Sequence, residues 1–371
     1  MLTHVMPSLL AALAVPGFDN PLGVRDVRAA CVLLVDGLGW AQLREHAVDA
    51  PFLSSLAEDS EPLVAGFPAT TATSLASLAT GQPAGVHGIV SYSFALPGIG
   101  LLDTLTWTAS DDDTQIDLRE RVLPEQVQPT VTMLERATHA GVDVTCVVPP
   151  RHEHSGLSRA VLRGGDFRAA RALGELAAAV LATLAKPHPA LCYAYLGDLD
   201  GLGHAHGPGS LEWRLHLSTV DHLVSTLAER MPPGSVLTIT SDHGMIDVPG
   251  DCRVDVDTHP VLREGVRYLA GDVRARHVYT QPGAAADVLA AWQEVLGPRA
   301  WVLSRDQATE AGWFGPVTGR VRPRIGDVVT ASCGHHGIVR SHAEPNVTAM
   351  VAHHGSFAPA EQHVLFLTSY R

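Results

Sequence analysis

Aspartate and histidine recur at several points of the chain, each time at or just after the end of an apolar run. The set comprises Asp36, Asp200, His204, Asp242, His243 and His354. An isolated Asp-Gly or His-Gly pair is usually only a turn. Six carboxylate and imidazole ligands, however, are enough for two borderline cations such as zinc, each keeping an open coordination position. The pattern therefore predicts a metal-binding site.

The last ligand of this set has a competitor. The chain contains two His-His-Gly sequences, at residues 335–337 and 353–355. We favour His354, because it follows a strand-like run near the end of the chain. His336 is the alternative.

Hydroxyl side chains cluster at the start of a helix predicted over residues 71–80. Thr70, Thr71, Thr73 and Ser74 are all candidates for its N-cap. A hydroxyl in this place, close to a metal, is also deprotonated more easily and faces the end of the helix that binds anions. The segment therefore offers a candidate nucleophile, and capping and catalysis can coexist there.

Four nearly continuous apolar runs predict the strands that position these residues. The runs span residues 31–36, 142–148, 190–196 and 235–241, and helical patterns span 71–80, 124–140, 167–185 and 211–230. Apolar runs of this kind are typical of strands covered on both faces. We therefore predict an α/β fold, a mostly parallel sheet with helices on both faces. Ligands of such sheets bind beyond the carboxyl ends of the strands.

The composition of the sequence changes after about residue 247, where proline, glycine and arginine become frequent. A strand at 277–280 and a helix at 284–296 are predicted in this stretch. A strand is predicted at 348–352 and a helix at 358–367, where the sequence again resembles the segments before residue 247. We predict a catalytic core of residues 1–248 and 335–371, with residues 249–334 inserted as a small α+β cap.

Composition excludes several classes of function. The 371 residues carry 26 Lys+Arg against 39 Asp+Glu, a net charge of −13, and no basic run offers a footprint for a nucleic-acid duplex. No apolar run approaches the roughly 20 residues needed to span a bilayer. The five cysteines have no C-x-x-C spacing, and the apolar N-terminus lacks a preceding basic region. We expect free thiols, an amphipathic first helix and a cytoplasmic location, with secretion as the alternative.

The order of the candidate residues resembles the alkaline phosphatase superfamily, specifically its type I phosphodiesterase/nucleotide pyrophosphatase branch, with phosphonoacetate hydrolase as a near relative. The matching order is Asp36, Thr71, Asp200-x-x-x-His204, Asp242-His243 and His354. In that branch the nucleophilic threonine lies ten residues before the glycine of a Thr-Gly segment. Thr71 lies ten residues before Gly81, so the resemblance favours Thr71 over Thr70. It covers most of the predicted core.

The resemblance implies two zinc ions. One would be held by Asp36, Asp242 and His243 and would contact Thr71. The second would be held by Asp200, His204 and His354.

The sequence departs from the family pattern in two places. The family has an aromatic-Pro-Asn sequence after the nucleophile, whereas this chain has Ala72-Thr73-Ser74. The asparagine that binds a phosphoryl oxygen in the family is replaced by Tyr92. The Tyr92 hydroxyl or a backbone N–H would take over that contact, unless Tyr92 only packs.

The resemblance implies a hydrolase of phosphodiester or pyrophosphate bonds that forms a phosphothreonine. Its substrate would be a small phosphorylated molecule such as a nucleotide. A phosphomonoesterase or a phosphonoacetate hydrolase-like enzyme is the alternative, because the same ligands would serve. A metal-binding protein without catalysis is a remote third possibility. The sequence leaves the oligomeric state open.

Overall fold

A six-stranded sheet forms the centre of the computed structural model, which describes residues 1–109 and 116–371. Its strand order is β19-β9-β1-β8-β6-β7, and all neighbours are parallel except β19, which pairs antiparallel with β9. The strands are β1 (Ala29–Val35), β6 (Asp143–Val148), β7 (Asp166–Ala169), β8 (Ala190–Leu196), β9 (Ser235–Thr240) and β19 (Phe366–Tyr370). The predicted α/β fold is confirmed, and each of the four apolar runs contributes a strand.

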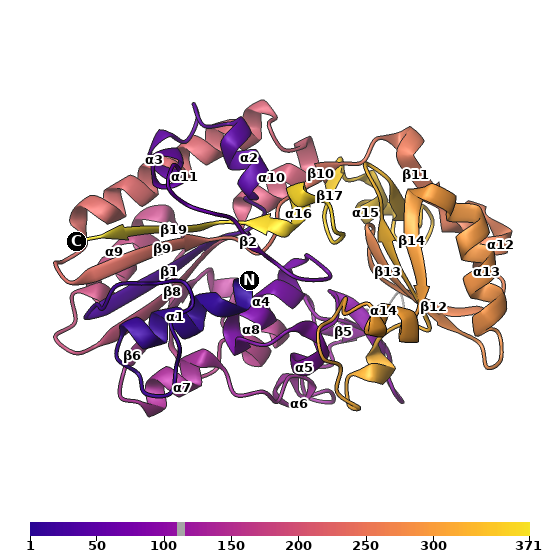
Figure 1. Cartoon of the computed structure of the whole chain (residues 1–371), viewed down its shortest axis with the longest axis horizontal. Coiled ribbons are helices and arrows are strands. Elements are labelled where there is room, and N and C mark those ends of the chain that lie inside the picture. Colours follow the sequence, from indigo (N-terminus) through magenta and orange to yellow (C-terminus); the bar gives the residue numbers. More distant parts are fainter. Residues whose placement is uncertain (110–115) are drawn as a thin grey trace.

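Helices cover both faces of this sheet (Figure 1). Alternate residues of β1 point to opposite sides, so Cys31 and Leu33 belong to one core cluster and Val32 and Leu34 to the other. The first cluster includes side chains of α3 (Pro51–Leu56), α9 (Leu173–Leu184) and α11 (Leu211–Arg230). The second includes α1 (Val5–Ala12) and α7 (Met133–His139). Burial on both sides explains why β1 and β8 are nearly continuous apolar runs.

Two predicted helices have different bounds in the structure. The helix expected at 124–140 is divided into α6 (Pro124–Val127) and α7, because Pro129 has no N–H to continue it and Thr132 starts α7 with a capping box. The segment expected as a helix over 167–185 begins as β7, which pairs with β6 at the edge of the sheet, and only then becomes α9.

The prediction for the C-terminal segment is wrong in detail. Residues 348–352 are not a strand, because α15 (Pro345–Ala349) occupies their first part and only β17 (Ala352–His353) follows. The helix expected at 358–367 is confined to α16 (Pro359–Gln362) and gives way to β18 (His363–Val364) and β19. The backbone groups of β19 find their hydrogen-bond partners in β9, a pairing that the local sequence could not reveal.

A second, antiparallel sheet of four strands, here called the cap sheet, lies at the other end of the molecule (Figure 1). Its order is β12-β13-β15-β14, with β12 (Val266–Asp272), β13 (Ala275–Thr280), β14 (Ala300–Ser304) and β15 (Val328–Ser332). Helix α13 (Ala285–Leu296) packs on it through Val288 and Trp292. The cap sheet falls inside the stretch assigned to the cap, whose boundaries remain a prediction.

Shorter elements complete the described chain. The helices are α2 (Trp40–Glu45), α4 (Thr71–Thr80), α5 (Ala84–His87), α8 (Gly156–Val161), α10 (Asp198–His206), α12 (Pro260–Arg263) and α14 (Arg305–Glu310). The strands are β2 (Leu63–Val64), β3 (Ser93–Leu96), β4 (Gly100–Asp103), β5 (Thr108–Ala109), β10 (Ile246–Asp247), β11 (Arg253–Asp255) and β16 (Gly337–Val339). Among residues 1–109 and 116–371, no helix is both long and apolar enough to cross a membrane.

Candidate metal centre

Three neighbouring strands bring the predicted ligands together at their carboxyl ends. Strand β1 lies between β8 and β9, and Asp36 follows β1 as Asp242 follows β9. Asp200 lies in the first turn of α10, which begins two residues after β8. The turn after β1 needs glycine, because Gly37 has φ +73° and a Cβ there would lie 2.9 Å from Asp200 Cα.

The first ligand group consists of Asp36, Asp242 and His243. One ligand atom from each lies within 4.8 Å of the others. His243 Nε2 is 3.4 Å from Asp36 Oδ1 and 3.6 Å from Asp242 Oδ2, and all three side chains are buried. The structure therefore brings together the three residues that the sequence assigns to one zinc.

The second ligand group differs slightly from the predicted one. Asp200, His243 and His354 form it, again within 4.8 Å of one another, so His243 belongs to both groups. His204 lies beside this group, with its Nε2 3.5 Å from Asp200 Oδ1. The rings of His243 and His354 stack with their centroids 3.5 Å apart. All six predicted ligands thus lie at one place.

The three histidines are oriented in the same way. Their Nδ1 atoms lie 3.0, 2.8 and 3.0 Å from the carbonyl oxygens of Gly244, Ala352 and Ala69, for His243, His204 and His354 respectively. A carbonyl only accepts hydrogen bonds, so each Nδ1 carries the proton and each Nε2 presents a lone pair to the carboxylates. Lone pairs facing carboxylate oxygens repel one another unless a cation lies between them. This arrangement is typical of metal-ligating histidine.

The carboxylates show the same requirement. Asp36 Oδ1, Asp200 Oδ1 and Asp242 Oδ2 are buried and have no hydrogen-bond partner among the described residues. The other oxygen of Asp36 accepts a hydrogen bond from the Tyr195 hydroxyl at 2.5 Å. The other oxygen of Asp242 accepts from the N–H of Gly37 at 3.2 Å. One oxygen of each of these two carboxylates is thus anchored and one is free to bind a cation.

The charged forms of these residues are unfavourable without a cation. Burial raises the pKa of Asp36 well above its usual range, and the charges of Asp242 and Asp200 add to this effect. Burial, together with the nearby His243 and His204, holds the pKa of His354 well below its usual value. A neutral His354 and three clustered carboxylates would be stabilised by divalent cations, so the residues fit the metal ions that the sequence predicts.

Thr71 is the hydroxyl that lies at this centre. It is the first residue of α4, and its Oγ1 donates to His243 Nε2 at 3.2 Å. Thr70 is the N-cap residue but makes no capping hydrogen bond, and its Oγ1 donates to Asp272 Oδ1 at 2.9 Å. Thr73 and Ser74 are buried. The geometry thus favours Thr71 as the candidate nucleophile.

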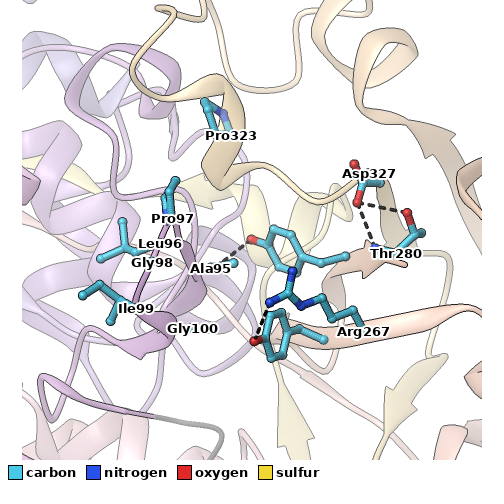
Figure 2. A pocket seen from close by; sticks show the side chains of 12 residues that line it. Ala95, Leu96, Pro97, Gly98, Ile99, Gly100, Arg267, Thr280, Pro323 and Asp327 are labelled. Atoms are coloured by element: carbon cyan, nitrogen blue, oxygen red, sulfur yellow. Dashed lines mark hydrogen bonds between the residues drawn. The ribbon is translucent and has the colours of Figure 1, made fainter. Parts of the chain in front are cut away.

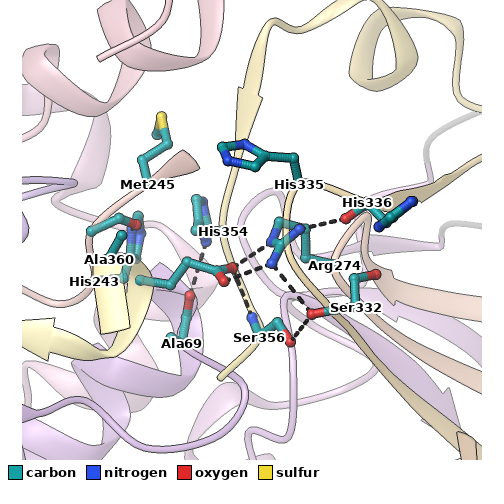
Figure 3. Close-up of polar contacts among 12 residues, drawn as sticks. Ala69, His243, Met245, Arg274, Ser332, His335, His336, His354, Ser356 and Ala360 are labelled. Carbon is teal, nitrogen blue, oxygen red and sulfur yellow. Dashed lines mark hydrogen bonds and ion pairs between the residues drawn. The ribbon is translucent and has the colours of Figure 1, made fainter. Parts of the chain in front are cut away.

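His336 lies apart from both ligand groups. Its Nδ1 contacts the carbonyl oxygen of Cys333 at 3.1 Å, and its own carbonyl accepts from Arg274. Figure 3 shows His336 beyond the Arg274 side chain, whereas His354 lies beside His243. The structure thus places the preferred histidine, and not its competitor, with the other ligands.

Tyr92 lies in a different environment from the ligands. Together with Asp103 and Glu344 it lines a cavity of about 810 Å³ between the β3–β5 strands and the cap sheet. Its carbonyl accepts from the N–H of Thr104 at 2.7 Å, and burial raises the pKa of its hydroxyl above the ordinary value. A second cavity, of about 440 Å³, is lined by Pro97 and Asp327 among others (Figure 2). None of the candidate ligands lines it.

Sequence reasoning did not single out two contacts of this centre. Tyr195 anchors Asp36 from within strand β8, where it reads as one more apolar residue. Asp272 belongs to the cap sheet and reaches Thr70 across about 200 positions of sequence. The alternation of side chains along a strand is the only sequence signal that could have predicted on which face of the sheet Tyr195 lies. No local sequence signal marks Asp272 as a contact of the centre.

Comparison with known proteins identifies the family. The model of the type I phosphodiesterase / nucleotide pyrophosphatase family matches residues 30–357. The chain belongs to this family. Membership confirms the resemblance seen in the sequence.

Solved structures of similar fold agree with this family. An inactive threonine-to-alanine variant of murine ectonucleotide pyrophosphatase / phosphodiesterase 5, in complex with AMP, superimposes with a TM-score of 0.73 at 18% identity, covering 92% of this chain and 87% of that one. Phosphonoacetate hydrolase from Sinorhizobium meliloti 1021, in complex with phosphonoformate, gives a TM-score of 0.70 at 20% identity, covering 93% and 90%. Both likenesses show the fold.

Two curated relatives match a shorter stretch. Phosphopentomutases of Anaeromyxobacter dehalogenans (strain 2CP-1 / ATCC BAA-258) and Anaeromyxobacter sp. (strain K) are each 26% identical over 159 residues. The match covers 42% of this chain and 39% of theirs. The chain therefore matches well under half the length of these relatives.

Proposed function

We propose that this protein is a two-zinc hydrolase of phosphodiester or pyrophosphate bonds with Thr71 as its nucleophile. One observation carries the proposal: the Thr71 hydroxyl lies 3.2 Å from Nε2 of His243, the residue that both ligand groups share. A hydroxyl with only a capping role would not need to lie beside a ligand histidine. In the murine structural neighbour, a threonine-to-alanine change is associated with an inactive protein.

The proposed ligands follow the family resemblance, with which the first geometric group agrees, whereas the second geometric group contains His243 in place of His204. Asp36, Asp242 and His243 would hold one zinc beside Thr71, and Asp200, His204 and His354 would hold the other. When bound, zinc acts as a Lewis acid that lowers the pKa of a nearby hydroxyl and stabilises negative charge on phosphoryl and leaving oxygens. Mixed carboxylate and imidazole ligands suit zinc better than magnesium or calcium.

The chain's own residues supply the covalent steps. Thr71 Oγ attacks phosphorus in line, the bond from phosphorus to the leaving oxygen breaks, and a phosphothreonine forms. Water then attacks the same phosphorus, the bond to Thr71 Oγ breaks, and the hydroxyl takes up a proton. Because the Thr70 hydroxyl does not cap α4, backbone N–H groups of its first turn remain available to a phosphoryl oxygen. These N–H groups are the proposed replacement for the family's asparagine. The Tyr92 hydroxyl, the other candidate from the sequence, is less suited, because Tyr92 lines a separate cavity with Asp103 and Glu344.

Charges around the centre favour a substrate with a single negative charge at phosphorus. The only lysine of the chain, Lys186, pairs with Asp143 at 2.6 Å. Two buried arginines of the cap are also paired with carboxylates, Arg274 with Glu361 at 2.7 Å and Arg276 with Glu344 at 2.7 Å. A third, Arg324, donates to the carbonyl oxygens of Gly88 and Val127. A phosphomonoester dianion or a phosphonate with a carboxylate would gain from a free cation, whereas a diester needs less compensation. Nucleotide diesters are the proposed class, and the AMP complex of the murine neighbour supports the nucleotide part of this class.

The test is a substrate panel on the purified protein with and without added zinc. The panel contains p-nitrophenyl phosphate, bis-p-nitrophenyl phosphate, a nitrophenyl ester of a nucleoside monophosphate, and phosphonoacetate. We expect about two zinc ions per chain by elemental analysis and faster hydrolysis of the two diesters. Preference for p-nitrophenyl phosphate or phosphonoacetate would overturn the substrate class, and a zinc-free active protein would overturn the metal assignment.

Two further predictions from the sequence remain proposals. Residues 249–334 would form the cap that sets specificity for the leaving group. All five cysteines are free, which supports a cytoplasmic location.

A further inference from the structure

A buried carboxylate of the cap reaches the residue next to the proposed nucleophile. Asp272 ends strand β12 and is only 7% exposed. Its Oδ1 accepts from Thr70 Oγ1 at 2.9 Å and its Oδ2 accepts from Ser91 Oγ at 2.7 Å. Both donors belong to the core segment around α4 and α5, so Asp272 connects the cap sheet directly to the start of α4.

The Thr70 hydroxyl makes this contact and no capping contact. A threonine at an N-cap normally accepts a hydrogen bond from the backbone of its own helix, a contact that contributes about 1 kcal/mol. Here Thr70 forms no such bond and donates to Asp272 instead. Burial raises the pKa of Asp272 to about 6, although its hydrogen bonds and the charge of Arg276 act in the other direction. Forgoing a cap and burying a carboxylate both cost stability, which suggests a gain elsewhere.

The backbone around Thr70 supports both sides of the metal centre. The N–H of Ala69 donates to Gly355 O at 3.1 Å, and the carbonyl of Ala69 accepts from Nδ1 of His354 at 3.0 Å. Thr71 follows directly, with its hydroxyl at His243. Gly355 packs so closely that a Cβ there would lie 3.2 Å from Asp272 Cβ. A shift at Thr70 would therefore move the nucleophile relative to the ligand histidines.

The same turn of the cap sheet holds the loop that carries His354. Arg274 forms a fully buried bidentate pair with Glu361, at 2.7 and 2.8 Å. Glu361 also accepts from the N–H of Ser356 at 3.0 Å, two residues after His354. Figure 3 shows Arg274 beside this loop. Two residues of one turn thus fix the two segments between which a substrate phosphoryl group would lie.

We propose that Asp272 is a positioning residue that holds Thr71 in line for attack by anchoring the Thr70 hydroxyl. The inference rests on the function proposed above. A carboxylate suits this task because it fixes two hydroxyl donors at once, and neither of them needs to touch the substrate. Misplacement of a nucleophile by about 1 Å costs on the order of a hundredfold in rate.

The experiment compares Asp272→Ala, Asp272→Asn and Thr70→Val in the zinc-loaded protein. We measure kcat and KM for bis-p-nitrophenyl phosphate, zinc per chain and thermal stability. Asp272→Ala and Thr70→Val should each lower kcat by about 10- to 100-fold, with KM and zinc content nearly unchanged. Asp272→Asn should keep most of the activity, because its amide oxygen still accepts from Thr70 and its NH₂ group can donate to Ser91.

The double variant Thr70→Val/Asp272→Ala separates positioning from general damage. If the two residues act through one hydrogen bond, the double variant should be no slower than the worse single variant. Asp327 offers a matched control, because it is a cap carboxylate that accepts from the Thr280 hydroxyl at 3.2 Å in another part of the cap. Asp327→Ala should lower stability and leave kcat unchanged.

A kcat within twofold of wild type for both Asp272→Ala and Thr70→Val would overturn the inference, and Thr70→Val decides alone if Asp272→Ala does not fold. Failure of the proposed function gives a different result. In that case Thr71→Ala would itself remain active, and the positioning role would fall with the nucleophile. An inactive, zinc-loaded Thr71→Ala beside a fully active Thr70→Val would refute the positioning role only.

Discussion

Thr71→Ala separates a nucleophile from a helix-capping residue, because the structure assigns very different magnitudes to the two roles. The N-cap position belongs to Thr70, and the side chain of Thr71 makes one hydrogen bond, to His243. Loss of that bond costs about 0.5–1.5 kcal/mol, partly offset by the better helix propensity of alanine. We therefore expect the melting temperature to fall by less than about 4 °C.

The expected effect on turnover is far larger. Removal of the attacking oxygen closes the covalent route, so kcat should fall by at least about a thousandfold. Both zinc ions should remain bound through the six other ligands. Thr71→Ser is the control variant, because it keeps a hydroxyl at the same place and should retain substantial activity.

The assay combines rate, metal content and chemical trapping. Hydrolysis of bis-p-nitrophenyl phosphate gives kcat, and elemental analysis gives zinc per chain. Acid quenching during turnover, followed by mass spectrometry, should find a p-nitrophenyl phosphoryl group on the peptide that contains Thr71, because the second ester group of the substrate stays on phosphorus. The same group on Thr70 or Thr73 would show that the nucleophile is misassigned, and a fully active Thr71→Ala would refute covalent catalysis at this position.

Three further predictions follow from the ligand groups and from a buried histidine of the cap. Asp242→Ala should lose zinc as well as activity, since this carboxylate is fully buried with a free oxygen; two zinc ions per chain in the folded variant would contradict its role. His354→Ala should weaken the binding of one zinc ion in a chelator competition, whereas His336→Ala should not. Burial lowers the pKa of His277 to about 4, so acidification from pH 6.5 towards pH 4 must protonate the unfolded state first. The contribution of His277 to the free energy of unfolding is therefore complete above pH 6.5 and falls by about 2 kcal/mol by pH 5. Urea unfolding of the metal-free wild type and of His277→Gln should show a weaker pH dependence of this free energy in the variant.

The central sheet was predictable because its signal is local and strong. The runs at β1, β8 and β9 are buried at nearly every position and mostly apolar, which is typical of strands with two covered faces. Parallel strands of one sheet end at the same edge, so Asp36 and Asp242 could be placed together before any geometry was known. The two-residue strand β17 and the edge strand β19 exist through pairing with β10 and β9. A prediction made from each segment alone therefore assigned the wrong secondary structure to this C-terminal region.

The residues of the candidate centre were predictable, but their division into two ligand groups was less so. Residue types and order led to all six ligands, yet His243 lies between both groups and not within one. Such sharing depends on the direction of the ring, which is fixed by the Gly244 carbonyl. Asp272 illustrates a further limit. Aspartate at the end of a strand is an ordinary turn residue in sequence, and only the packing of the cap sheet against α4 gives it two hydroxyl partners.

The negative charge of the centre explains why it would need bound cations before it could bind a phosphate ester. The chain carries a net charge of −13, and three carboxylates meet where the substrate's phosphorus would lie. Arginine does not compensate for them, since Arg274 and Arg276 are held by Glu361 and Glu344. Bound divalent cations reverse the sign of the local field, and this reversal is confined to the centre because distant charges are screened within about 10 Å. The net negative charge would then disfavour polyanions such as nucleic acids, while the proposed metal centre would still attract a small phosphodiester.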